Sequence, residues 1–111
     1  MLSQEQVKGL VREAFEMCRQ QMPVKSCWLY GSYARGDFDD ESDVDILMSV
    51  SVPEEELRKY RHAVADINSK LSLKYDITVS ITVKTEENFV KYSRFVPYYK
   101  NVLREGQLYA G

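Results

Sequence analysis

One stretch, Gly31–Ile46, constrains the fold of this chain most, because it combines a glycine-bounded turn with two acidic residues on a strand. The residues before it, Val24–Tyr30, predict a short buried strand that leads directly into Gly31-Ser32. Glycines at positions 31 and 36 leave the backbone uncovered, so that its N–H groups can approach an anion closely. We therefore expect a strand, an anion-binding turn and, after an acidic loop, a second strand over Ser42–Val50.

The second predicted strand carries two aspartates. Alternation along Ser42–Val50 places Asp43 and Asp45 on one face and the apolar residues between and beyond them on the other. Two carboxylates side by side repel each other unless a cation lies between them. Mg²⁺ prefers oxygen ligands and typically binds one or two carboxylates together with substrate phosphates. A metal-binding strand beside a phosphate-binding turn indicates nucleotidyl or phosphoryl transfer.

This stretch resembles the signature of the DNA polymerase β-like nucleotidyltransferase superfamily, in which Gly-Ser is followed by ten residues and then Asp-x-Asp. Here residues 33–42 separate Gly31-Ser32 from Asp43-Val44-Asp45. The fuller pattern, Gly-Ser-x-Ala-Arg-Gly…Ser-Asp-x-Asp, is similar to the minimal nucleotidyltransferase branch, whose members are commonly encoded beside a HEPN-family partner. The resemblance implies that Gly31, Ser32, Arg35 and Ser42 bind the nucleotide, with Ser32 holding the triphosphate, and that Asp43 and Asp45 bind Mg²⁺ and serve catalysis.

A third carboxylate is expected from Tyr75–Val83, where alternating apolar and polar residues predict a strand. Asp76 falls on the polar face of that strand. In the resembled superfamily, a third acid from a later strand completes the metal site and can act as base toward the acceptor hydroxyl. Asp76 is the matching position, so the implied catalytic and metal-binding set is Asp43, Asp45 and Asp76. The alternative for Asp76 is an exposed aspartate at the start of a strand.

Other charged residues near the motif have structural alternatives. Arg35 can donate to nucleotide phosphates, or it can pair with the acidic residues that follow it. That acidic run is typical of a solvated loop, and we expect no metal ligand in it; it comprises Asp37, Asp39, Asp40 and Glu41. His62 lies off the apolar stripe of its predicted helix, among basic residues, which predicts a surface position.

Helical periodicity accounts for most of the remaining chain. Ser3-x-x-Gln6 has the form of a capping box and opens the first helix. A second helix begins at Pro53 with an acidic first turn, and its apolar stripe continues to Leu71. Shorter helices are expected in the last quarter. This order predicts an α/β (α+β) domain of two layers, in which helices cover one face of a small mixed sheet and the acids lie on its open face.

Size and charge narrow the functional classes. A length of 111 residues fits a single domain spanning 1–111. A formal charge of −2 gives no basic face for nucleic acid, which weighs against a template-dependent polymerase. Cys18 and Cys27 predict buried apolar positions and fit a reducing cytoplasm. We find no signal peptide and no apolar run of transmembrane length, so a cytoplasmic protein without membrane contact is expected.

These features predict a metal-dependent enzyme that moves NMP, by expectation AMP from ATP, onto a hydroxyl at a site with two Mg²⁺ ions. Little sequence remains after the catalytic core, so the acceptor must meet a small surface or arrive with a partner. The resemblance implies an antitoxin that adenylylates a tyrosine of a HEPN-type toxin, within a homo- or hetero-oligomer. Two alternatives stay open: a non-catalytic antitoxin that neutralises its partner by binding, and a small-molecule transferase of the aminoglycoside-modifying type.

Overall fold

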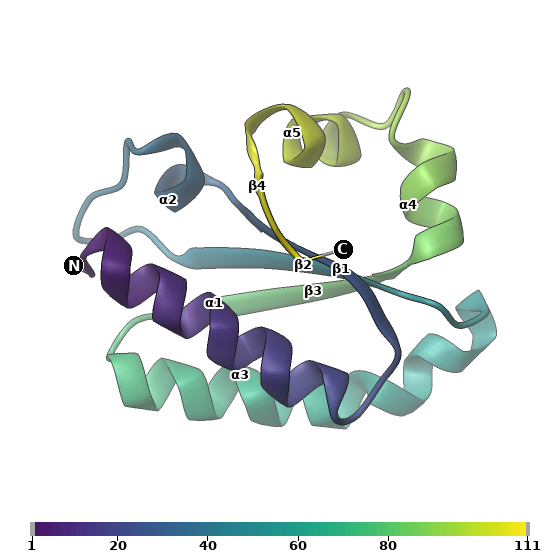
Figure 1. Cartoon of the computed structure of the whole chain (residues 1–111), viewed down its shortest axis with the longest axis horizontal. Coiled ribbons are helices and arrows are strands. Elements are labelled where there is room, and N and C mark those ends of the chain that lie inside the picture. The colour runs from purple at the N-terminus through teal and green to yellow at the C-terminus, as the bar shows by residue number, and fades with distance from the viewer. Residues whose placement is uncertain (1, 111) are drawn as a thin grey trace.

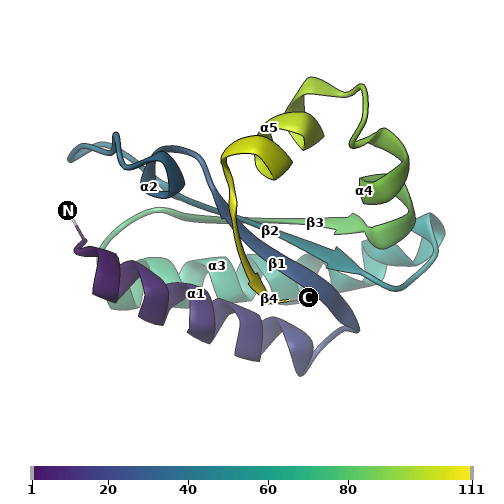
Figure 2. The same ribbon diagram turned by 45° about the horizontal axis from the view of Figure 1, so that its top comes forward.

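The computed structural model describes residues 2–110 as a four-stranded sheet with helices on both faces (Figure 1). The long helices α1 (Gln4–Arg19) and α3 (Arg61–Tyr75) lie side by side on one face. The short helices α4 (Glu86–Tyr92) and α5 (Pro97–Glu105) lie over the other face (Figure 2). The 3-10 helix η1 (Glu54–Tyr60) leads into α3. The mixed α/β class is confirmed, but the second face of the sheet is more covered than the sequence predicted.

The sheet has the strand order β3-β2-β1-β4. Strand β1 (Val24–Tyr30) pairs antiparallel with β2 (Val44–Val50), as expected for two strands joined by a short turn and loop. Strand β2 pairs parallel with β3 (Val79–Thr85), and this pairing requires a long crossover, which η1 and α3 supply. Strand β4 (Gln107–Ala110) pairs antiparallel with β1 at the edge.

The main core lies between the sheet and the two long helices. The capping box at the start of α1 is formed: the Ser3 hydroxyl accepts from the Gln6 N–H at 3.1 Å, and the Gln6 side chain accepts from the Ser3 N–H at 2.8 Å. The apolar stripe of α1 packs against alternate residues of β2, and the side chains on both elements are buried. These buried residues include Val7, Leu10, Val11, Ala14 and Cys18 of the helix and Val44, Ile46 and Met48 of the strand.

A second, smaller core lies on the opposite face. Leu47 alternates with the core residues of β2, so its side chain points away from the long helices and packs with residues of α4 and α5. Its buried partners are Phe89, Tyr99 and Val102. This cluster holds the two short helices on the sheet and limits the open part of that face to the end near Asp45.

The predicted start of the third strand was wrong. Tyr75 belongs to α3, and its hydroxyl donates to the carboxylate of Glu13 on α1. Asp76 ends the helix in the left-handed region, with φ 53° and ψ 47°, and β3 begins only at Val79. The Tyr75 side chain is apolar over most of its length, so the sequence pattern is compatible with the end of a helix as well as with the start of a strand. The contact with α1 extends the helix, and no local pattern reports that contact.

The C-terminal strand was not predicted. After Gly106 ends α5, Gln107–Ala110 returns along the free edge of β1. Its first three side chains are exposed, so it lacks the alternation that marks a half-buried strand. It forms because β1 offers unpaired backbone groups along that edge. Among residues 2–110, no helix combines the length and apolar character needed to cross a lipid bilayer.

Candidate functional site

The predicted anion-binding turn forms as a single helical turn at the end of β1. Helix α2 (Ser32–Arg35) follows Gly31, whose carbonyl accepts from the N–H groups of Ala34 and Arg35 at 3.1 and 3.0 Å. Gly36 ends the turn with φ +90°, a conformation that glycine adopts without steric cost. Tyr33 is buried and stacks on Phe38 with ring centroids 4.4 Å apart, which ties the turn and its loop to the core.

Gly31 lies directly against the carboxylate of Asp45. In the β1–β2 ladder Tyr30 pairs with Asp45, so the residue after Tyr30 turns over the end of β2. Gly31 has φ +77° and ψ −158°, a region that is essentially restricted to glycine. A Cβ atom at this position would lie 2.5 Å from Oδ2 of Asp45, closer than real atoms pack. The bare backbone of Gly31 therefore makes the space that the Asp45 carboxylate occupies.

The two predicted metal ligands lie at the start of β2. Asp43 is exposed, and Asp45 is partly buried on the face away from the long helices. Burial raises the pKa of Asp45, the negative charge of Asp43 raises it further, and Arg35 partly offsets both effects. Two carboxylates that repel each other and lie beside a glycine backbone supply the oxygen ligands and the negative charge that Mg²⁺ prefers. The donor set therefore suits this ion.

Two predicted nucleotide-binding residues make structural contacts in the acidic loop or beside it. The Ser42 hydroxyl accepts from the Asp39 N–H at 2.9 Å and donates to the Asp39 carboxylate at 3.3 Å, which closes the loop before Asp43. Arg35 pairs with Asp37 at 3.2 Å and with Glu105 of α5 at 3.3 Å. Arg35 thus makes the acidic pairing that the sequence left open as one alternative. Its ion pairs are solvent-exposed and contribute little to stability, so a phosphate could compete for the guanidinium.

Asp76 is the third predicted metal ligand. It is the exposed C-cap of α3 and lies before β3, not on the polar face of a strand as predicted. Within residues 2–110, no group of three or more His, Cys, Asp and Glu side chains is arranged to hold a metal ion. Asp43 and Asp45 are therefore the two carboxylates of the candidate site, and the residue that pairs with Asp45 on β3 is Ser80.

An aromatic wall beside Asp45, formed by Tyr30 and Tyr98, was not predicted. The hydroxyls of Tyr30 and Tyr98 are hydrogen-bonded at 2.9 Å, with their rings edge to face at 5.7 Å. Burial, and then the bond to Tyr30, raise the pKa of Tyr98, so the Tyr98 hydroxyl stays protonated near pH 7. Tyr30 could have been noted as the residue before Gly31. Its contact with α5 depends on tertiary packing and has no local signal.

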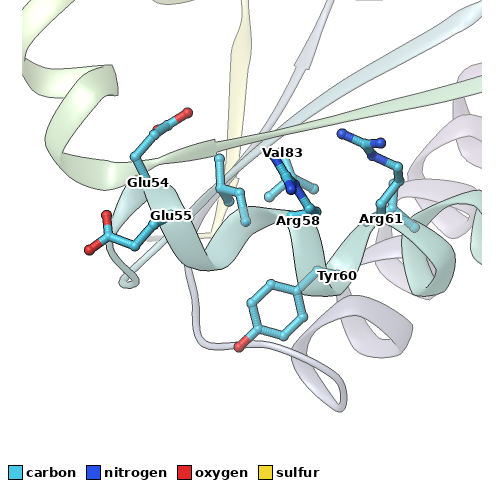
Figure 3. Close-up of a pocket in the computed structure, with 8 residues that line it drawn as sticks. Glu54, Glu55, Arg58, Tyr60, Arg61 and Val83 are labelled. Carbon is cyan, nitrogen blue, oxygen red and sulfur yellow. The ribbon is translucent and has the colours of Figure 1, made fainter.

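A pocket elsewhere contains none of the predicted site residues. It has a volume of about 560 Å³, lies between η1, α3 and β3, and is lined by Glu54, Glu55, Leu57, Arg58, Tyr60, Arg61, Val64 and Val83 (Figure 3). In the close-up, Tyr60 points away from the arginines that precede and follow it. Charges of both signs line this pocket, so it favours no particular ligand charge. His62, which follows Arg61, is exposed on α3, as predicted.

Comparisons with known proteins agree with this geometry. The profile of the family described as "Nucleotidyltransferase domain" matches residues 11–109. A Methanocaldococcus jannaschii protein, provisionally named a protein adenylyltransferase, is 39% identical over 85 residues, which is 77% of each chain.

Two solved toxin–antitoxin complexes contain chains with the same fold. One, determined with AMP-PNP, gives a TM-score of 0.60 at 17% identity and covers 94% of this chain and 73% of that chain. The other is a tri-AMPylated Shewanella oneidensis HEPN toxin in complex with an MNT antitoxin. It gives a TM-score of 0.56 at 16% identity and covers 98% of this chain and 74% of that chain. At these identities the likeness shows a shared fold.

Proposed function

This chain belongs to the nucleotidyltransferase domain family and is a nucleotidyltransferase, and from that premise we propose that it is an antitoxin that transfers AMP from ATP to a tyrosine of a HEPN-type toxin. The M. jannaschii relative named as a protein adenylyltransferase supports a protein acceptor. The Shewanella oneidensis complex of a tri-AMPylated HEPN toxin with an MNT antitoxin supports this class of partner and this nucleotide.

The observation that carries the proposal is the contact between the Gly31 backbone and the Asp45 carboxylate. This contact joins the Gly-Ser turn and the acidic strand into one site, although the acidic loop separates them in sequence. A nucleoside triphosphate in this site would have its phosphates against the turn, and Asp43 and Asp45 would hold its metal. When bound there, Mg²⁺ would neutralise phosphate charge and orient the α-phosphate.

The turn has the groups needed to hold the β- and γ-phosphates. The first N–H groups of any helix have no acceptor within that helix. In α2 these N–H groups belong to the residues at its start, beginning with Ser32. The Ser32 hydroxyl adds a further donor, and the Arg35 guanidinium can exchange its exposed carboxylate partners for a phosphate. Ser42 contributes by keeping the acidic loop closed next to Asp43. The nucleotide is thus held by backbone and short side chains from one continuous segment.

The reaction is the displacement of pyrophosphate by a hydroxyl group. The acceptor oxygen attacks the α-phosphorus, and the bond from that phosphorus to the pyrophosphate oxygen breaks. The hydroxyl proton passes to solvent or to a base on the partner protein. In this scheme the residues of the chain position the triphosphate and balance its charge, and they form no covalent intermediate.

The test incubates the neighbouring gene's product with this protein, Mg²⁺ and each NTP in turn, and records intact masses and fragment spectra. We expect a gain of one AMP unit per modified residue with ATP, located on tyrosine, and no gain when EDTA removes the metal. Asp45→Ala should abolish the gain, because it removes half of the carboxylate pair. Asp40→Ala is the matched control, since Asp40 is an exposed acid of the loop that precedes β2, and it should retain the gain.

Each contrary outcome has a defined meaning. No mass gain, together with a tight complex on size exclusion, would replace the enzymatic proposal with an antitoxin that acts by binding. A gain that maps to another residue type would refute the tyrosine assignment alone. Transfer that persists in EDTA, or in Asp45→Ala, would refute the metal site.

A further inference from the structure

Strand β3 presents two kinds of side chain to the two faces of the sheet. Val79, Ile81 and Val83 pack with the core under α1 and α3. Because side chains alternate along a strand, Ser80 and Thr82 lie on the opposite face, which is the face of Asp45. Thr82 lies next to Tyr98 of α5, which with Tyr30 forms the aromatic wall. Ser80 is the position of β3 that lies at the open end of the sheet.

The register between β2 and β3 sets Ser80 directly beside Asp45. Neighbouring strands run about 4.8 Å apart, and paired residues point to the same face, so their side chains are adjacent. A carboxylate at position 80 would lie next to Asp45 and close to Asp43. No other position of β3 combines the correct face with pairing to Asp45.

We infer, on the basis of the proposed function, that Ser80 occupies the place of a third metal-binding carboxylate. This chain then holds its metal with Asp43 and Asp45 alone. From β3 it directs only a hydroxyl group toward the acceptor. Ser80 therefore sets the affinity for the metal. Because it is not a carboxylate, the acceptor's proton must be removed by a group other than a carboxylate of this chain.

Other acids in the described part of the chain do not take this place. Asp76, at the end of α3, lies before β3 begins. Glu105 and Asp37 are both paired with Arg35. The absence of any three-membered metal-binding group within residues 2–110 agrees with this. A nucleotide's phosphates must then supply ligands that a third carboxylate would otherwise supply, which makes metal binding depend on the nucleotide.

The experiment measures Mn²⁺ binding by electron paramagnetic resonance, without nucleotide or partner protein. We expect weak binding by the unaltered chain and binding about tenfold tighter or more in Ser80→Asp, because metal affinity rises with the number of charged ligands. Ser80→Asn, which has the same shape without the charge, is the matched control and should bind as weakly as the unaltered chain. Asp76→Asn should leave Mn²⁺ binding unchanged.

Thermal unfolding provides a second readout. Without metal, Ser80→Asp should melt below Ser80→Asn, because three carboxylates then repel one another, and Mn²⁺ should reverse that order. Equal Mn²⁺ affinity in the two variants, or a Ser80→Asp protein that stays unfolded with Mn²⁺ present, would overturn the inference. A large loss of Mn²⁺ binding in Asp76→Asn would overturn it as well. None of these measurements requires transfer activity, so the inference and the proposed function can fail separately.

Discussion

Replacing Gly31 by alanine tests whether the turn positions the carboxylate of Asp45. The added Cβ would lie 2.5 Å from Oδ2 of Asp45, whereas ordinary contacts begin near 3.4 Å. The carboxylate must therefore move by about 1 Å, and a displacement of about 1 Å at a reacting site can lower the rate about 100-fold. Alanine at this backbone conformation also costs about 1–3 kcal/mol of stability. For a chain of this length that is a fall in Tm of about 4–12 °C.

Gly36→Ala separates the two effects. Gly36 also has a positive φ, +90°, but no heavy atom lies within 4 Å of the Cβ that alanine would add. We expect a loss of about 1–2 kcal/mol from backbone strain alone, with transfer reduced no more than a few-fold. The assay compares Tm by circular dichroism with initial rates of AMP transfer, at a temperature where both variants are folded. Equal rates for Gly31→Ala and Gly36→Ala would refute the positioning role of Gly31.

Two further predictions concern stability. Asp45→Asn should raise the Tm at pH 7, because burial and the charge of Asp43 raise the pKa of Asp45, so the ionised carboxylate opposes folding. A group with a raised folded pKa contributes stability below its unfolded value, ordinarily near 3.8, and loses it as pH rises. The advantage of Asp45→Asn should thus vanish as pH falls below about 4 in a series of melts, and a constant advantage would contradict the assigned cause. Thr85→Ala should cost about 1–2 kcal/mol in urea unfolding, because the buried Thr85 hydroxyl caps α4 by accepting from the Asn88 N–H at 3.1 Å. Thr78→Ala, at an exposed position, is its control, and equal losses would argue against the cap.

Much of the site could be predicted from short-range patterns. The strand before Gly31, the glycine-bounded turn and the alternation around Asp45 depend on residues within a few positions of one another. The capping box at Ser3 is likewise local, and it forms as expected. In each case the conformational preference of the backbone and the spacing of apolar residues act within one element, so the sequence carries the complete signal.

Which residues lie together at the candidate site depends on the tertiary structure. Asp76 was expected on a strand because its neighbours alternate, yet α3 continues to Tyr75, which bonds Glu13 of α1, and Asp76 is the C-cap of that helix. Position 80 became the neighbour of Asp45 only through the parallel register of β2 and β3, which a long crossover connects. Register is set by how the two apolar faces meet the same helices, and a shift of one residue would reverse the face of every side chain.

Local patterns were enough to predict a glycine-bounded turn followed by two neighbouring carboxylates, because those features lie within one short segment. The contact of Gly31 with Asp45, and the pairing of Asp45 with Ser80, depend on the tertiary fold. The physical reason is the distance over which each interaction acts. Turn and strand preferences are properties of neighbouring residues, whereas the third position of the site depends on the pairing of strands that are far apart along the chain.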